Sequence, residues 1–538
     1  MPDVSSTPGP LCIDYVSPLP PVRSGIADYS RDLLPHLARH CDVRVVAVPG
    51  QPISPELVEA LKPVDVEDLG HDGRLPLFHM GNNLHHAEVW KLAMATPGVV
   101  ALHDVVLHHL LIEATLGTGD HDTYARRLEA DHGWIGRLVA RARRWGELSD
   151  AAVFELPAHR DLLCRQRGVL VHSRWAALQV EEENPGIEIR VVPMAVPLPE
   201  RVAAEEAMEF RRRHGLPADR PLLGSFGFQT PIKRADVVVR SMAEPELADA
   251  HLVVAGEVSP ALDLEALAKE LGVAERVHIT GFLDYDEFEA AITACDLCLN
   301  LRYPTAGETS ASLLRVLALG RPAVVSNYAQ FAELSSEVAI KIPLGEDEVT
   351  SLARTVGETV SDTVTLAGMG EAAREFVRRQ HDPDRAAREF VEALGELATI
   401  EPLGLQELTI EPPTTLLWQD LPGEIEVANA ELPWQVGSAK QLSVRLRNSG
   451  PARWLPTKEQ PGGVILDVQW RREPGGDAVE RTWAELPRHV DEGDQFEFRL
   501  ELRRPREGRF LVVEPHVEGI AGFSKFGGPT WIADYAGQ

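Results

Sequence analysis

Two adjacent cations precede a predicted helix in the second half of the chain. The apolar run 222–227 is followed by a loop that carries Lys233 and Arg234 where the next helix is expected to begin. Positive charges at a helix N-terminus oppose the helix dipole, so a bound anion explains them better than local stability does. A diphosphate is the natural anion for such a loop, and a solvent-exposed basic turn is the alternative.

A second loop of this half offers further anion-binding groups. It follows the predicted strand 297–302 and contains Glu308, Thr309 and Ser310, ahead of a helix that is expected to end near Leu319. Thr309 or Ser310 is suited to cap that helix, whose free N–H groups form a second phosphate cradle opposite Lys233. We expect Glu308, at the apex of the loop, to face hydroxyl groups of a ligand.

The first half carries polar residues at corresponding positions. Gly25 lies between the first apolar run and an amphipathic helix, where a glycine lets N–H groups approach a phosphate or sugar closely, although any tight turn also uses glycine. His103 and Asp104 end a buried run, at the edge where open α/β sheets bind substrates. They are suited to hydrogen-bond a sugar hydroxyl or stabilise a developing charge, and a structural histidine is the alternative. The histidines within 79–86 lack the spacing of a metal site, so we expect no metal.

These loops are placed by a repeated pattern of short and long segments. Between residue 11 and about residue 397, short apolar runs alternate with longer amphipathic stretches, which is typical of parallel strands joined by helices. The proline-rich segment 193–199 interrupts the pattern. We therefore predict two Rossmann-like domains, at 1–197 and 198–397, that face a ligand cleft. The expected strands are 11–17, 43–48, 75–80, 99–104, 169–173 and 189–196 in the first domain, and 222–227, 252–256, 277–281, 297–302, 322–326 and 339–342 in the second.

The character of the sequence changes after Pro402. Short alternating strands replace the helical periods, and six of the ten tryptophans lie beyond residue 417. We predict an all-β sandwich at 405–538, similar to the Ig-like modules attached to bacterial polysaccharide enzymes. Its tryptophans either fill the core or stack on sugar rings as a carbohydrate-binding module.

Composition narrows the class of protein further. The formal net charge of -29 over 538 residues argues against a general affinity for nucleic acid. The five cysteines lie in apolar surroundings, and Cys295 and Cys298 are expected to be a buried structural pair rather than a redox motif. The first residues lack the features of a signal peptide, and no run of about 18 apolar residues occurs. We therefore predict a cytoplasmic protein without a membrane span.

Taken in order, these motifs resemble the GT-B glycosyltransferases of family 4 over residues 10 to 397. The resemblance includes the SGIADYS loop, GNN followed by LHD, VHS, the GF…K loop, GFLDYDEF and PTAGETSASLLRVLALGRP. It implies retaining transfer of a sugar from a nucleotide-diphospho-sugar to a glycan or lipid-linked acceptor in surface polysaccharide or glycoconjugate synthesis, with no required cofactor. Cationic groups and helix dipoles would stabilise the leaving diphosphate.

The resemblance also assigns roles to individual residues. His103 and Asp104 would be the sugar-contacting pair, and Lys233 and Glu308 would complete the catalytic set. The predicted donor-binding residues, which include some that depart from the family pattern, are Gly25, Lys233, Arg234, Phe282, Leu283, Arg302, Glu308, Thr309, Ser310 and Arg315.

Two departures from the family pattern affect the donor site. Phe228 stands where the family usually has an arginine, so Arg234 or Arg302 is expected to supply the missing charge. Arg315 stands where the family has the glutamate that holds the ribose, and Glu308 is shifted by one position. The donor nucleotide is therefore not assigned, and a non-catalytic glycan-binding protein with a degenerate transferase body is the alternative.

The segment 124–145 combines arginines with apolar residues at helical spacing. On an otherwise acidic protein, such a helix suggests contact with a membrane surface or a lipid diphosphate at the inner membrane face. The alternative is a helix whose apolar side, including Trp134 and Trp145, packs on the domain core.

Overall fold

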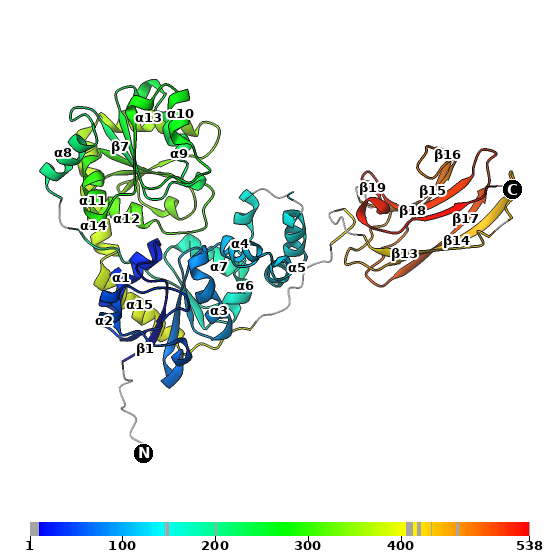
Figure 1. Ribbon diagram of the computed structural model, residues 1–538, viewed down its shortest axis with the longest axis horizontal. Coiled ribbons are helices and arrows are strands. Elements are labelled where there is room, and N and C mark those ends of the chain that lie inside the picture. The colour runs from blue at the N-terminus through cyan, green and yellow to red at the C-terminus, as the bar shows by residue number, and fades with distance from the viewer. Residues whose placement is uncertain are drawn as a thin grey trace, which may run out of the picture. The chain divides into compact units, whose positions relative to one another are not determined.

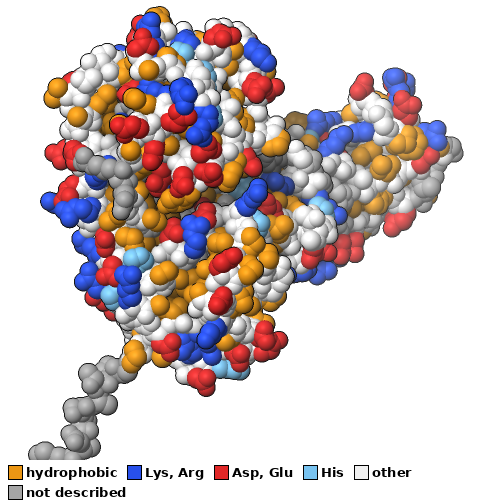
Figure 2. Space-filling view, turned by 60° about the vertical axis from the view of Figure 1, so that its left-hand side comes forward, with side chains coloured by type: hydrophobic (Ala, Val, Ile, Leu, Met, Phe, Trp, Pro, Cys, Tyr) orange, Lys and Arg blue, Asp and Glu red, His pale blue; other side chains and the backbone are white. Residues whose placement is uncertain are grey.

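The architecture is that of a computed structural model, which describes residues 10–144, 146, 150–199, 202–404, 413–416, 421–431, 433–458 and 462–536. By its internal contacts the chain divides into two compact units. The first comprises 1–132 and 139–407, and the second comprises 133–138 and 408–538. Acidic and basic side chains are interspersed over the visible face of the first unit (Figure 2).

The first unit begins with a six-stranded parallel sheet in the order β2-β1-β3-β4-β5-β6. All six residues of β3 are buried, because apolar clusters cover both faces of the sheet, as expected for parallel strands flanked by helices. The strands are β1 Cys12–Val16, β2 Asp42–Val45, β3 Leu75–Met80, β4 Val99–Leu102, β5 Gly168–Val171 and β6 Ile189–Val191. The helices are α1 Gly25–Leu37, α2 Pro55–Leu61, α3 Ala87–Ala95, α4 His108–Thr115, α5 His121–Arg144, α6 Arg160–Cys164 and α7 Arg174–Glu183.

A second six-stranded parallel sheet follows in the order β12-β11-β10-β7-β8-β9, again with helices on both faces (Figure 1). Its strands are β7 Leu222–Phe226, β8 His251–Ala255, β9 Val277–Gly281, β10 Leu297–Asn300, β11 Ala323–Ser326 and β12 Ala339–Ile342. The helices of this half are α8 Ala204–Arg213, α9 Ala235–Ser241, α10 Leu264–Glu270, α11 Tyr285–Ala294, α12 Ala311–Ala318, α13 Glu348–Val360, α14 Thr363–Gln380 and α15 Pro383–Leu397. The twelve strands predicted from the sequence are present, which confirms the two parallel α/β halves.

Helix α15 follows the second half in sequence but packs into the hydrophobic core of the first half. Phe390, Leu394 and Leu397 of α15 are buried in the same cluster as Ile13 and Leu33 of the first half. Helix α15, which lies inside the range 198–397 predicted for the second domain, therefore packs on the first sheet. The chain crosses between the halves twice, at the proline-rich segment 193–199 and ahead of Pro383.

The second unit contains two antiparallel sheets. One has the order β13-β14-β17, and the other has the order β16-β15-β18-β19 with β20 paired to β18. Inward residues alternate along β14 and β15 and fill one hydrophobic core together with Trp434, Trp454 and Trp470. The strands are β13 Gly423–Ala428, β14 Ala439–Asn448, β15 Val464–Arg471, β16 Ala478–Glu485, β17 Gln495–Arg503, β18 Phe510–Val517, β19 Ala521–Gly522 and β20 Trp531–Asp534.

Other features of the sequence have a direct structural outcome. Cys295 and Cys298 are buried free thiols, as predicted for a structural pair. In α5, Tyr124 and Leu128 are buried in a small apolar cluster, whereas Ile135 is 41% exposed. Trp145 lies outside the described residues. Among the helices of the described residues, none is long and apolar enough to cross a bilayer.

Candidate active site

The amino group of Lys233 lies at the carboxyl end of β7, directly over the backbone of the turn that follows this strand. It donates a hydrogen bond of 3.0 Å to the carbonyl of Phe226. Burial lowers the pKa of Lys233 well below its usual value, and nearby Arg302 lowers it further, while Glu308 opposes the shift. An anionic partner would strongly stabilise the charged form of this partly buried amino group.

Gly227 creates the space beneath this amino group. Its φ of 86° lies in the left-handed region, and a Cβ atom there would come within 2.8 Å of the Lys233 Nζ. The same Cβ would lie 3.8 Å from the Ser312 hydroxyl, so Lys233 and the first turn of α12 flank one glycine. Ser310 caps α12 by accepting a hydrogen bond from the N–H of Leu313, as predicted. The cation and the helix N-terminus therefore flank one glycine, an arrangement that is suited to bind an anion and that we call the cradle.

Glu308 is fixed by the loop that contains it. Its Oε1 accepts a hydrogen bond of 2.9 Å from Arg302, and its Oε2 accepts bonds from Thr305 at 2.8 Å and from the N–H of Ala306 at 3.1 Å. The side-chain amide of Gln330 donates to the backbone carbonyl of Glu308. The carboxylate that we expected at the loop apex is thus oriented by protein groups before any ligand arrives.

The structure separates the two arginines proposed to replace the missing family arginine. The Arg234 guanidinium forms an ion pair with Glu348 at the start of α13, whose side chain is 3% exposed. Arg302 is 5% exposed, pairs with Glu308, and lies close enough to Lys233 to lower its pKa. Arg302 is the one of the two that adds positive charge beside the cradle.

In the first half, Gly25 is the first residue of α1, capped by the Ser24 hydroxyl. A Cβ at Gly25 would meet nothing within 4 Å, and its φ is not positive. Neither packing nor backbone conformation requires glycine at this position. The open space at the N-terminus of α1 suits a ligand that approaches the backbone closely.

His103 belongs to a stack of buried rings below the end of β4. Its Nε2 lies 2.9 Å from Nδ1 of His79, and it contacts the rings of Tyr29 and His172 at centroid distances of 5.0 Å. Burial, with the nearby His172 and His79, holds the pKa of His103 well below its ordinary value. The ring is therefore neutral at pH 7, which suits hydrogen bonding rather than charge stabilisation.

Asp104 follows directly and lies near the second half. Its carboxylate accepts a 2.7 Å hydrogen bond from the N–H of Asn82. Burial raises its pKa to about 7, and the negative charge of Glu308 contributes to the shift. The two carboxylates come from opposite halves and are close enough for the charge of Glu308 to affect Asp104.

Direct contacts join the two halves around these residues. The N–H of Val106 donates a 2.9 Å hydrogen bond to the carbonyl of Ala306, and Gly307, with a φ of 86°, packs close to Val105 and Trp175. Glu333 accepts hydrogen bonds from the first two N–H groups of α7, at 3.3 Å and 2.5 Å. The loops that carry Asp104 and Glu308 are therefore held against each other.

The predicted nucleotide-binding residues form a separate group. The exposed ring of Phe282 lies 5.8 Å from the Arg23 guanidinium, and Leu283 is buried. Arg315 lies 4.4 Å from the ring centroid of Tyr285 and 4.0 Å from Asp32 on α1. The arginine at the ribose-glutamate position is therefore held by an aromatic ring and an acid of the first half.

A cavity of about 670 Å³ lies between the halves. Thr309, Ser310 and Gln330 line it from the second half, and His172 and Arg174 line it from the first. A volume of this size fits a sugar-sized ligand. Among the described residues, no group of three or more His, Cys, Asp or Glu side chains is placed to hold a metal ion.

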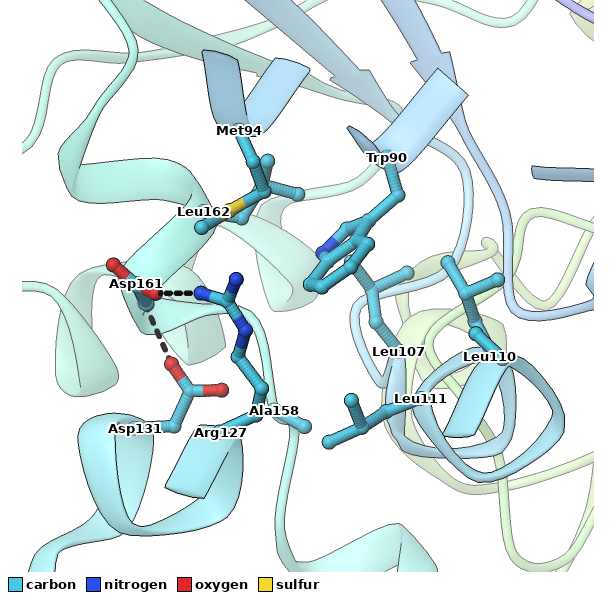
Figure 3. Close-up of a pocket in the computed structure, with 11 residues that line it drawn as sticks. Trp90, Met94, Leu107, Leu110, Leu111, Arg127, Asp131, Ala158, Asp161 and Leu162 are labelled. Carbon is cyan, nitrogen blue, oxygen red and sulfur yellow. Dashed lines mark hydrogen bonds and ion pairs between the residues drawn. The ribbon is translucent and has the colours of Figure 1, made fainter. Parts of the chain in front are cut away.

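A second cavity, within the first half, is much smaller. Trp90, Arg127 and Asp161 line it, and Figure 3 shows Arg127 paired with Asp161 and lying beside the indole ring. Its volume of about 10 Å³ is comparable to that of a single water molecule, so it is not a substrate site.

Sequence reasoning missed several residues that build the site. Gly227 makes room for Lys233, whereas Thr305 and Gln330 orient the Glu308 loop. The role of Gly227 could have been suspected, because a glycine at the end of a predicted strand often marks a close approach of the backbone. Gln330 lies 22 residues from Glu308, and no local pattern connects the two.

Comparison with known proteins agrees with this geometry. Residues 206–376, which contain the Lys233 and Glu308 loops, match the family described as glycosyl transferases group 1. The 2-deoxystreptamine glucosyltransferase of Streptomyces kanamyceticus is 30% identical over 258 residues, which are 46% of this chain and 62% of that protein. The D-inositol 3-phosphate glycosyltransferase of Stackebrandtia nassauensis is 28% identical over 204 residues, which are 36% of this chain and 45% of that protein. The chain thus spans less than two thirds of the length of these relatives.

Solved structures share the arrangement of the two parallel sheets. Sucrose-phosphate synthase from Thermosynechococcus elongatus aligns with a TM-score of 0.52 at 16% identity, covering 72% of this chain and 99% of that protein. HepE of Anabaena in complex with UDP and glucose aligns with a TM-score of 0.50 at 13% identity. The alignment covers 72% of this chain and 99% of that protein. The fold of the two halves is therefore like that of the GT-B proteins.

Proposed function

We propose that this protein is a retaining, family 4 glycosyltransferase that moves a sugar from a nucleotide-diphospho-sugar to a glycan or lipid-linked acceptor. The observation that carries the proposal is the cradle in which the Lys233 Nζ and the N-terminus of α12 flank Gly227. The match of residues 206–376 to the group 1 transferases supports it. An anion-binding site of this kind is suited to a leaving diphosphate.

The residues around the cradle have different roles in sugar transfer. Lys233, Arg302 and the α12 N–H groups stabilise the negative charge that develops on the diphosphate as the bond to the sugar breaks. Because burial opposes a charge on Lys233, the diphosphate gains more from this group than from an exposed lysine. The oriented Glu308 carboxylate and the neutral His103 ring bind sugar hydroxyls, with Asp104 beside them.

The donor-binding surface extends toward the first half. Gly25 leaves room for a phosphate at the N-terminus of α1, and Phe282, Leu283 and Arg315 border the nucleotide. HepE, whose fold this chain shares, is described in complex with UDP and glucose, so UDP-glucose is the first donor to test. The reaction uses no cofactor in this proposal.

The wider setting follows from the same proposal. We place the reaction in surface polysaccharide or glycoconjugate synthesis, in the cytoplasm or at the inner membrane face through α5, and we take the C-terminal sheets to be an Ig-like module. The burial of Tyr124 and Leu128 favours packing over membrane contact for the first part of α5. Sedimentation with anionic and with neutral liposomes tests the membrane contact: binding to anionic lipid alone would support it, and binding to neither would identify α5 as a structural helix.

A donor screen tests the proposed activity. The full chain is incubated with UDP-, GDP- and ADP-sugars, and the shift in unfolding temperature is followed by release of the nucleoside diphosphate in the presence of acceptor glycans. We expect one donor to stabilise the protein and to be turned over. If none stabilises it at millimolar concentration, the non-catalytic glycan-binding alternative is supported instead.

A further inference from the structure

One large aromatic side chain of the second unit lies on the outside of its sheet. Trp483 of β16 is 62% exposed, whereas Trp434, Trp454 and Trp470 are at most 3% exposed and form the core. Trp483 pairs across the strands with Asp467, on the outward face of β15. Core packing thus explains the three buried tryptophans and does not explain Trp483.

Trp483 borders a hollow with mostly polar walls. The cavity has a volume of about 460 Å³, and among the described residues that line it Ile465 is the one other apolar residue. The polar lining residues are Thr457, Lys458, Arg481, Glu485 and Glu518. An apolar protein interface would surround an exposed indole with further apolar side chains. Here the indole is surrounded by hydrogen-bonding groups instead.

The polar groups beside the indole are fixed in position. Arg481 donates two hydrogen bonds of 2.7 Å to Asp467, whose side chain is 3% exposed. The Thr457 hydroxyl donates to the carbonyl of Val464 and accepts from the N–H of Leu486. A site with groups ordered in advance loses less conformational entropy when a ligand binds.

The charge of the lining indicates the class of ligand. Lys458 and Arg481 are balanced by Glu485 and Glu518, so the described residues of the lining carry no net charge. A phosphate or a polyanion would require an excess of cations. A neutral molecule with many hydroxyl groups instead meets both donors and acceptors here, and the apolar face of a pyranose ring matches an indole.

We propose that this face of the β16–β15–β18 sheet is a binding site for a neutral saccharide, with a sugar ring stacked on Trp483 and its hydroxyls hydrogen-bonded to Arg481 and Glu485. This site is separate from the proposed transferase site and independent of that function. The competing occupant is a second copy of the chain, because β16 is an edge strand with an unpaired side.

Affinity electrophoresis of the full chain tests the proposal. Native gels contain dextran, glycogen or galactomannan, and retardation is compared among the wild type, Trp483→Ala and Ile532→Ala. Ile532 is the matched control, since it is 48% exposed on the opposite edge strand, β20. We expect at least one polysaccharide to retard the wild type and Ile532→Ala, and Trp483→Ala to weaken binding about tenfold.

Further measurements separate the alternatives. Glu485→Ala should weaken binding without altering the aromatic platform, and both variants should keep the wild-type unfolding temperature and any donor turnover. The proposal is overturned if no polysaccharide retards the wild type, or if Trp483→Ala is retarded equally. A change in oligomeric state on Trp483→Ala, seen by light scattering without a change in retardation, would show that the face binds a second copy instead.

Discussion

At the scale of single residues, the proposed chemistry depends on Lys233, whose charged form is destabilised by burial. Replacing Lys233 with Ala removes the ammonium group above Gly227 and should lower kcat/KM by at least about 100-fold, as loss of a major electrostatic group does. The measurement is nucleoside diphosphate release with the donor that the screen identifies. Lys269→Ala, on the exposed side of α10, is the charge-matched control and should retain activity. Equal activity in Lys233→Ala with an intact fold would remove this residue from the mechanism.

The two arginines beside this lysine should behave differently. Arg302 pairs with Glu308 near the cradle, whereas Arg234 pairs with Glu348 on α13. Arg302→Lys keeps the charge but loses the planar fork, so it should weaken donor binding and turnover about tenfold or more. Arg234→Ala should instead lower the unfolding temperature, because it leaves the buried Glu348 carboxylate without this partner, with a smaller effect on donor binding. Donor titration and thermal unfolding of both variants measure the contrast, and a reversed pattern would make Arg234 the phosphate-binding residue.

At the scale of elements, Glu333 of the second half contacts the N-terminus of α7 in the first half. Glu333 accepts from the N–H groups of Arg174 and Trp175, while Ser173 caps the next turn by accepting from Ala176. Glu333→Ala should cost about 1 kcal/mol of stability through loss of the helix cap. It should also weaken donor binding a fewfold, because the closed arrangement of the halves is less populated.

Thermal unfolding and donor titration check this prediction. Glu337→Ala removes an exposed acid four residues away and is the control for net charge. If the two variants behave alike, Glu333 acts through its charge and not as a link between the halves.

The elements themselves were largely predictable from the sequence. Buried parallel strands such as 99–102 are continuous apolar runs, and their alternation with amphipathic stretches indicated two sheets. The path of α15 was not predictable, because its apolar face fits either half and only packing selects the first. The same holds at the site, where Lys233 was evident from its loop but the partner of Arg234 was not. Glu348 lies 114 residues away, and no local periodicity encodes such a pair.

At the scale of the whole molecule, the first half contains an unusual number of buried neutral histidines. Burial lowers the pKa of seven of them, and it brings the pKa of His86, His159 and His172 to about 4. The other four are His79, His103, His108 and His132. Asp104 and Asp131, whose pKa burial raises to about 7, act in the opposite direction, since their protonated forms favour the fold as the pH falls. The histidines outnumber them, so acid should destabilise this half.

The sign of the effect follows from proton linkage. A histidine with a folded pKa near 4 contributes its full stability above 6.5 and loses it as the pH falls, because the unfolded chain then binds protons that the fold excludes. A single such group loses about 2 kcal/mol between pH 7.5 and pH 5. His159 tests this, since its Nδ1–H donates to Val105 at 2.7 Å and its Nε2 is buried without a hydrogen-bond partner. His159→Asn keeps a donor to Val105 but cannot be protonated, so its unfolding temperature should fall less between pH 7.5 and pH 5 than that of the wild type. The exposed His121→Asn should follow the wild-type profile, and equal slopes for all three proteins would show that burial of His159 does not set the acid sensitivity.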